Sequence, residues 1–139
     1  MKTLLKAVAA ASVLAAGVCF ACDGEEHVAV KELTLPQVQA LHQASKATFV
    51  DANGKEFRAK NGTIPGAVLL TSYSQYEPAK ELPQNKAQKL VFYCAGLKCG
   101  ASHIAAEKAL QAGYQDVSVF PGGLSGWKSA GQPTRMPQS

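Results

Sequence analysis

Cys94 is the residue in this chain best placed to do chemistry. It follows the apolar run from Lys89 to Tyr93, which is rich in strand-forming residues. The loop after it consists of Ala95, Gly96, Leu97, Lys98, Cys99, Gly100 and Ala101. Backbone N–H groups in such a loop, at the start of a helix, form a cradle for anions and favour the thiolate. We therefore expect Cys94 to be a nucleophile in sulfur transfer or redox chemistry, with Lys98 adding a cation.

Two other side chains near Cys94 allow more than one interpretation. Cys99 is either a resolving thiol that forms a reversible disulfide with Cys94 or a small residue packed at the helix start. The alternative interpretation of Cys94 is that it is an inert buried thiol. The spacing of Cys94, Cys99 and His103 is not one of the usual zinc patterns, so we expect no metal. His103 is expected on the helix surface or at the mouth of the cradle.

The order of elements predicts an α/β fold. Apolar runs at 47–50, 67–70, 89–93 and 117–120 indicate strands. Helical spacing or capping signals occur at 34–42, 55–60 and 101–111, with a weak helix at 73–80 and a short turn carrying Leu124 and Trp127. Alternation of strands and helices predicts a mainly parallel sheet with its site beyond the carboxyl ends of the strands, where Cys94 stands.

The chain resembles the rhodanese family in two separate stretches. The second half of a rhodanese domain is similar to residues 91–127, with Tyr93-Cys94, a loop, a helix, a strand, Gly122-Gly123 and Trp127. The first half is similar to residues 49–70, with Asp51, Glu56-Phe57 and the run from Gly62 to Ala67. The resemblance implies a five-stranded, mainly parallel sheet with helices on both faces. It also implies that Cys94 accepts sulfane sulfur as a persulfide and passes it to a thiophilic acceptor.

Several positions depart from the family pattern. Asn53 stands where the family has an Arg after Asp51, so an expected cation is absent, and Thr63 replaces a His. Related phosphatases need an Arg six residues after the cysteine, where Gly100 stands, which argues against phosphatase activity. Asp51 is expected to support a turn, whereas Gly122, Gly123 and Trp127 are expected to serve the architecture.

The N-terminal residues indicate export. Lys2 and Lys6 precede an uncharged run from Ala7 to Cys22, shorter than the about 20 residues of a membrane span, and Ala21 ends a plausible cleavage site. We expect a signal peptide at 1–21 and a periplasmic protein, with a lipid anchor at Cys22 as the minor alternative. Lys2 and Lys6 account for two of the 14 Lys and Arg residues, which stand against 10 Asp and Glu, so no nucleic-acid partner is indicated.

The sequence thus predicts a flexible lead at 22–32, a rhodanese-like domain at 33–134 and a tail at 135–139. The leading hypothesis is a sulfurtransferase or sulfur carrier using Cys94, with no cofactor. Its partners would be a small sulfur-containing anion and a thiol acceptor, which includes a protein thiol. The alternatives are a thiol–disulfide protein using Cys94 and Cys99, and a non-catalytic binding module.

Overall fold

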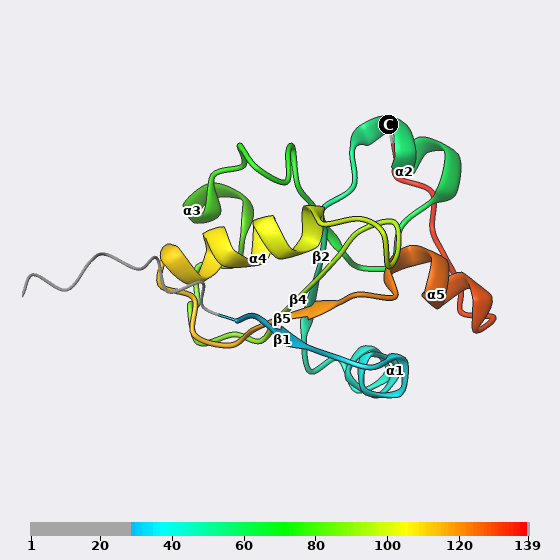
Figure 1. Ribbon diagram of the computed structural model, residues 1–139, viewed down its shortest axis with the longest axis horizontal. Coiled ribbons are helices and arrows are strands. Elements are labelled where there is room, and N and C mark those ends of the chain that lie inside the picture. The colour runs from blue at the N-terminus through cyan, green and yellow to red at the C-terminus, as the bar shows by residue number, and fades with distance from the viewer. Residues whose placement is uncertain (1–28, 139) are drawn as a thin grey trace, which may run out of the picture.

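The computed structural model describes residues 29–138, which form a parallel sheet between two layers of helices (Figure 1). The expected signal peptide, Cys19 and Cys22 lie outside the described residues. The strands are β1 (Lys31–Glu32), β2 (Thr48–Asp51), β3 (Val68–Leu69), β4 (Leu90–Tyr93) and β5 (Val117–Phe120). The helices are α1 (Leu35–Gln43), α2 (Lys55–Asn61), α3 (Pro78–Glu81), α4 (Ala101–Gln111) and α5 (Gly123–Ser129).

The sheet has the order β1-β5-β4-β2-β3, and every neighbouring pair is parallel. This confirms the predicted five-stranded α/β fold. β4 lies in the middle, with all four of its residues buried, so the residue that follows it emerges at the centre of the carboxyl edge. That residue is Cys94.

Alternate residues of β4 enter two separate cores. Leu90 and Phe92 pack with Ala105 and Ala109 of α4. On the other face, the side chains of β4 pack with residues of α1 and α5, including Trp127. This alternation follows from the two-residue repeat of a strand, and it fixes which face of the sheet each side chain of β4 occupies.

Local signals explain most of the helices. Thr34 precedes α1, and its N–H donates to Gln37 Oε1 at 2.9 Å, while Pro36 occupies the first turn. The predicted helix at 101–111 and strand at 117–120 agree with α4 and β5. α2 extends through Asn61, one residue beyond the predicted turn.

Two predicted segments were wrong. The weak helix at 73–80 is mostly absent: only its last three residues are helical, as the start of Pro78–Glu81. The preceding residues form a loop that buries Tyr76, whose hydroxyl donates to Ala105 O at 2.7 Å. Lys31 and Glu32, expected in a flexible lead, pair with Ser118 and Val119 as an edge strand.

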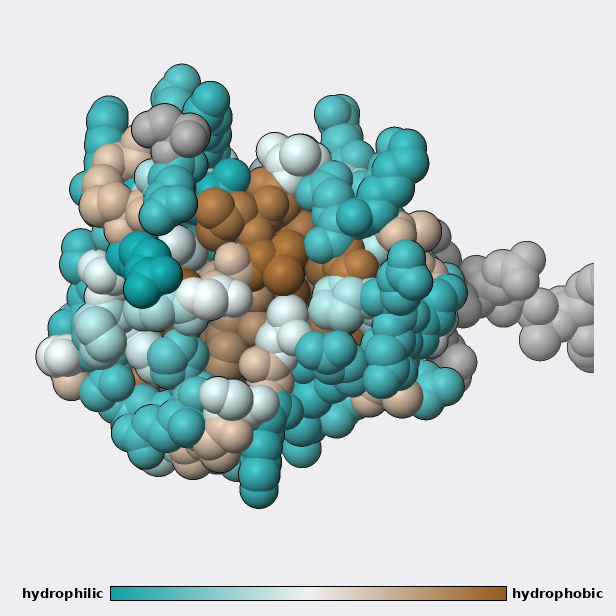
Figure 2. Space-filling view, turned by 180° about the vertical axis from the view of Figure 1, so that it is seen from behind, coloured by the Kyte–Doolittle hydropathy of each residue, from teal (hydrophilic) through white to brown (hydrophobic). Residues whose placement is uncertain are grey.

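The C-terminal residues are also tied to the domain. Arg135, expected in the tail, exchanges backbone hydrogen bonds of 2.9 Å with Thr63. No helix among residues 29–138 is long and apolar enough to cross a membrane. The face turned away from the viewer in Figure 1 is mostly hydrophilic, with an apolar area between two hydrophilic projections (Figure 2).

Candidate active site

Cys94 lies at the carboxyl end of β4 beneath the loop that leads into α4. Its thiol donates to the backbone carbonyl of Cys99 at 3.0 Å and lies 3.4 Å from Ser102 Oγ. Only 1% of the residue is exposed, and it belongs to the core that packs under α4. The predicted position beyond the central strand is thus correct, but the sulfur is covered.

Because Cys94 is buried, the acidity of its thiol differs from the sequence prediction. Burial raises the pKa of the Cys94 thiol, and its hydrogen bonding to Cys99 raises the pKa further because a thiolate has no proton to donate. The hydroxyl and backbone N–H of Ser102 act in the opposite direction without outweighing the burial. The expectation of a lowered pKa at Cys94 was therefore wrong for this arrangement of the loop.

Cys99 occupies the environment that was expected for Cys94. Burial opposes its ionisation, but hydrogen bonds from the Cys94 thiol and from the N–H groups of Ala101 and Ala95 outweigh it and lower the pKa of Cys99. Cys99 is half-buried and faces a surface hollow. Two amides of the predicted anion-binding loop, those of Ala95 and Ala101, thus favour the thiolate of Cys99.

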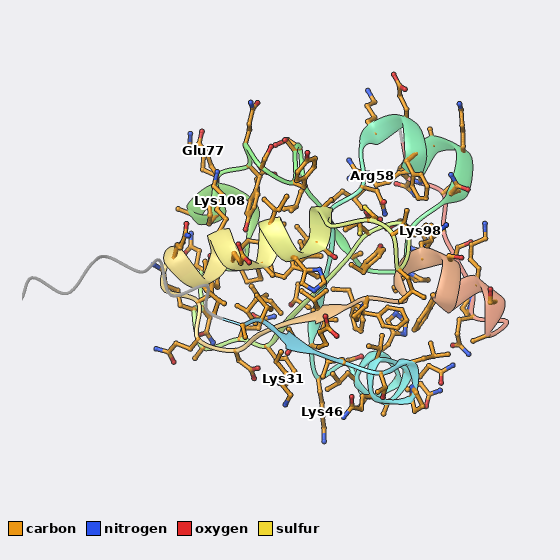
Figure 3. The ribbon with its side chains drawn as sticks, viewed as in Figure 1. Lys31, Lys46, Arg58, Glu77, Lys98 and Lys108 are labelled. Atoms are coloured by element: carbon orange, nitrogen blue, oxygen red, sulfur yellow. The ribbon has the colours of Figure 1, made fainter. Side chains whose placement is uncertain are left out.

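The hollow beside the cysteine loop is lined by Cys99 but not by Cys94, and it has a volume of about 530 Å³. It is lined by the backbone and side chains of residues 95–99 and by one face of α5, including Ser125 and Ser129. A second hollow shares Ala95 and both serines and adds Lys128. Among residues 29–138, the charged side chains that line these hollows are Lys98 and Lys128, and Lys98 lies at the end of the molecule near α5 (Figure 3). The surroundings therefore favour a small anion.

Helix α5 holds the first part of the loop in place. The N–H of Leu124 donates to Cys94 O at 2.8 Å, and the N–H of Ser125 donates to Ala95 O at 2.9 Å. Gly123 has a φ of +56°, and a Cβ there would lie 2.5 Å from Cys94 O. Gly122 is equally restricted, since its Cβ would lie 2.8 Å from the Phe120 ring. Together with Trp127, which is 1% exposed, these glycines have the architectural role that the sequence predicted.

Asp51 supports a buried polar network beside the site, as expected. Its carboxylate accepts hydrogen bonds from the N–H and side-chain amide of Asn53, both at 2.8 Å. It also accepts from the hydroxyls of Thr63 and Tyr93, both at 2.7 Å. Thr63, at the position of the family's His, is thus used to hold a carboxylate and a tyrosine hydroxyl together.

Arg58 supplies a cation close to Asn53, the position at which the family pattern has an Arg. Its buried guanidinium, beneath α2 in Figure 3, donates to the carbonyl oxygens of Asn53 and Leu70. The sequence could not indicate this role, because Arg58 stands in the helix after the turn and its exposure depends on tertiary packing.

His103 lies on the surface of α4, the first of its two expected positions. Its Nε2 is 3.1 Å from Glu32 Oε1, so its ring is directed to the edge strand. Within residues 29–138, no group of three His, Cys, Asp or Glu residues could hold a metal ion. Cys94, Cys99 and His103 are therefore not brought together as ligands.

Comparison with known proteins identifies the family. The model of the rhodanese-like domain matches residues 34–130. The chain belongs to the rhodanese-like family. No curated protein matches the rhodanese-like chain in sequence.

Solved structures agree with this assignment. A protein of unknown function from Rhodopseudomonas palustris, described as a possible tyrosine phosphatase, is 31% identical over 76% of this chain and 85% of its own, with a TM-score of 0.64. A thiosulfate sulfurtransferase from Pseudomonas aeruginosa is 27% identical over 79% of this chain but 21% of its own, with a TM-score of 0.66. The human single-domain sulfurtransferase is 28% identical over 72% and 96%, with a TM-score of 0.57.

Several site residues of this rhodanese-like protein were not found from the sequence. Ser102 contacts the Cys94 sulfur, and Ser125, Lys128 and Ser129 line the hollows. The sequence signal for the residues of α5 was the short segment after Gly122-Gly123. A helix that begins where its backbone lies close to a loop turns one of its faces toward that loop.

Proposed function

We propose that this protein is a sulfurtransferase that carries sulfane sulfur as a persulfide on Cys94. The observation that carries the proposal is the position of Cys94 at the end of the central strand, directly before a loop that lines two hollows whose charged lining residues, among residues 29–138, are lysines. The sulfurtransferases among the structural relatives support the same class of reaction.

The proposed reaction has two displacement steps. The Cys94 thiolate attacks the outer sulfur of thiosulfate, the new S–S bond forms, and sulfite leaves with the electron pair of the bond that breaks. A thiolate acceptor then attacks the outer sulfur of the persulfide, and Cys94 leaves as a thiolate. Covalent storage of the sulfur separates donor and acceptor reactions, so the two molecules need not meet in the site.

Each step makes a demand on the loop. A thiolate at Cys94 cannot donate to the Cys99 carbonyl, so that carbonyl has to turn away when the proton leaves. Ser102 remains as a donor to the anion through its hydroxyl and its N–H. Lys98 and Lys128 would attract the anionic donor and stabilise the departing sulfite electrostatically.

The test is uptake of sulfur from thiosulfate or a polysulfide, followed by intact mass. The expected product is an adduct of about 32 Da, the mass of one sulfur atom, or the sulfide released from it, and both are abolished in Cys94→Ser. Cys22→Ser, whose cysteine lies outside the residues that match the family, is the control and must take up sulfur as the unmodified chain does. If Cys94→Ser retains the adduct, or if the unmodified chain neither holds an adduct nor releases sulfide with either donor, the proposal is rejected; the second result would favour a binding module.

A further inference from the structure

Cys94 and Cys99 are neighbouring free cysteines in one loop, with different surroundings. Cys94 is 1% exposed, and its thiol donates to the carbonyl oxygen of Cys99 at 3.0 Å. Cys99 lines the hollow, and the N–H groups of Ala101 and Ala95 help to lower the pKa of its thiol. Any sulfur carried on Cys94 would thus lie next to a second thiol.

The loop keeps this second thiol in place by its own hydrogen bonds. The N–H of Cys99 donates to Gly96 O at 3.0 Å, which closes a turn over Cys94. The N–H of Ile104 donates to Gly100 O at 3.2 Å and begins the ladder of α4 directly after Cys99. Cys99 is therefore fixed between a turn and a helix, where little movement is needed for it to attack a group on Cys94.

The chemical states of the two sulfurs complement each other. Hydrogen bonds to the Cys99 sulfur lower its pKa against the effect of burial, whereas the pKa of Cys94 is raised, so Cys99 is the more readily ionised thiol of the pair. In thiol–disulfide exchange the thiolate attacks, and the more acidic partner of the broken S–S bond leaves more readily. A persulfide on Cys94 presents an S–S bond to that thiolate.

We propose that Cys99 resolves the persulfide on Cys94, releasing hydrosulfide into the hollow and leaving a Cys94–Cys99 disulfide. The inference rests on the proposed function, because it requires sulfur on Cys94. The Cys99 thiolate attacks the inner sulfur, the Cys94–Cys99 bond forms, and the bond to the outer sulfur breaks, so this sulfur leaves with the electron pair as HS⁻. The two cysteines are oxidised by two electrons and the sulfane sulfur is reduced by two.

The cycle then requires a dithiol reductant. One thiolate of the dithiol opens the Cys94–Cys99 bond, its second thiol closes the mixed disulfide, and both cysteines return to their starting state. The overall reaction reduces sulfane sulfur to sulfide at the expense of a dithiol. This places the protein between a reaction that supplies sulfane sulfur and one that supplies dithiol electrons.

The experiment uses the full chain carrying Cys19→Ser and Cys22→Ser, so that only the two site thiols remain. The chain is reduced, freed of reductant, treated with one equivalent of thiosulfate or polysulfide, quenched with an alkylating agent and digested with trypsin. Cleavage after Lys89, Lys98 and Lys108 places Cys94 in the peptide 90–98 and Cys99 in the peptide 99–108. A disulfide between them joins two otherwise separate peptides.

The expected result is about one sulfide released per chain without added reductant, together with the joined peptides. Cys99→Ser should release no sulfide in that first turnover and should retain an adduct of about 32 Da on the peptide 90–98. Cys99→Ala guards against a hydroxyl-specific effect, and melting curves of both variants establish that they fold.

The two proposals fail in different ways. If both the parent chain and Cys99→Ser hold a stable persulfide on the peptide 90–98 and no joined peptides form, Cys99 does not resolve and the sulfurtransferase proposal survives. If neither chain takes up sulfur, both proposals are overturned. If Cys94→Ser carries the adduct on the peptide 99–108, the assignment of roles is reversed and the inference is rejected.

Discussion

Replacing Gly123 by Ala tests whether α5 positions the cysteine loop. The new Cβ would lie 2.5 Å from Cys94 O, 2.7 Å from Gly96 N and 2.9 Å from Ala95 C, and the residue would keep a φ of +56°. All three neighbours are backbone atoms, so no side chain can rotate aside. Left-handed strain of about 1–2 kcal/mol and overpacking of about 1–3 kcal/mol together predict a loss of about 2–5 kcal/mol in unfolding free energy.

The loss can be measured by urea denaturation followed through the fluorescence of Trp127, the single tryptophan, which is buried. In a domain of this size the same loss corresponds to a fall of roughly 10–20 °C in melting temperature. Uptake of sulfur from thiosulfate should fall with it, even below the melting temperature, because the N–H groups of Leu124 and Ser125 would no longer meet the loop carbonyls.

Gly126→Ala, three residues further along α5, is the matched control. A Cβ there would meet only Phe120 Cζ at 3.5 Å, an ordinary contact, so the change should stabilise the chain by up to about 1 kcal/mol. The reasoning is refuted if Gly123→Ala unfolds within 1 kcal/mol of the parent chain, on the scale of that control, and also takes up sulfur at the parent rate.

Three further outcomes are expected. Tyr93→Phe removes the hydroxyl that donates to the buried Asp51 carboxylate at 2.7 Å, and urea denaturation should show a loss of about 2–3 kcal/mol. Iodoacetamide should modify Cys99 before Cys94. Because the pKa of Cys99 is lowered and that of Cys94 is raised, the alkylation rate of Cys99 should begin to rise at a lower pH than that of a free thiol, and the rate of Cys94 at a higher pH. Lys128→Gln should raise the KM for thiosulfate several-fold at low salt and less at high salt, because screening weakens the attraction.

Each of these outcomes has a control and a contrary result. Tyr73→Phe, at a side chain that is 41% exposed, should leave stability unchanged, and equal effects at both tyrosines would contradict the role of the buried network. Faster modification of Cys94 would contradict its cover by the loop. Lys46→Gln, at a lysine that lines neither hollow, should leave the KM unchanged, and an equal effect there would indicate only a loss of overall charge.

The parts of the fold that were predicted correctly carry their own signals. α4 has helical spacing and begins after two glycines, and β5 is a short apolar run between turns. The prediction for the segment before α3 was wrong because Tyr76 is held by a hydrogen bond to Ala105, far along the chain. β1 was not predicted because two polar residues give no strand signal of their own; they form a strand only by pairing with β5.

The site, like the fold, was predictable from the sequence only in part. A thiol after a central strand follows from the topology of parallel sheets, and the location of Cys94 was therefore available from the sequence. The distribution of loop amides between Cys94 and Cys99 was not, because it depends on the dihedral angles of residues 95–101. Those angles are set by contact with α5, and spacing along the chain does not encode them.

The hydrogen bonds from α5 divide the cysteine loop into two parts with unequal freedom. Carbonyls at positions 94 and 95 are tethered to α5, whereas the Cys99 carbonyl that covers the inner sulfur accepts only from the Cys94 thiol in the hydrogen bonds described above. Loss of the thiol proton releases that carbonyl and leaves the tethered part stationary. Ionisation at Cys94 would in this way uncover the sulfur it charges, so that the inner cysteine stays shielded from oxidants until the moment it becomes reactive.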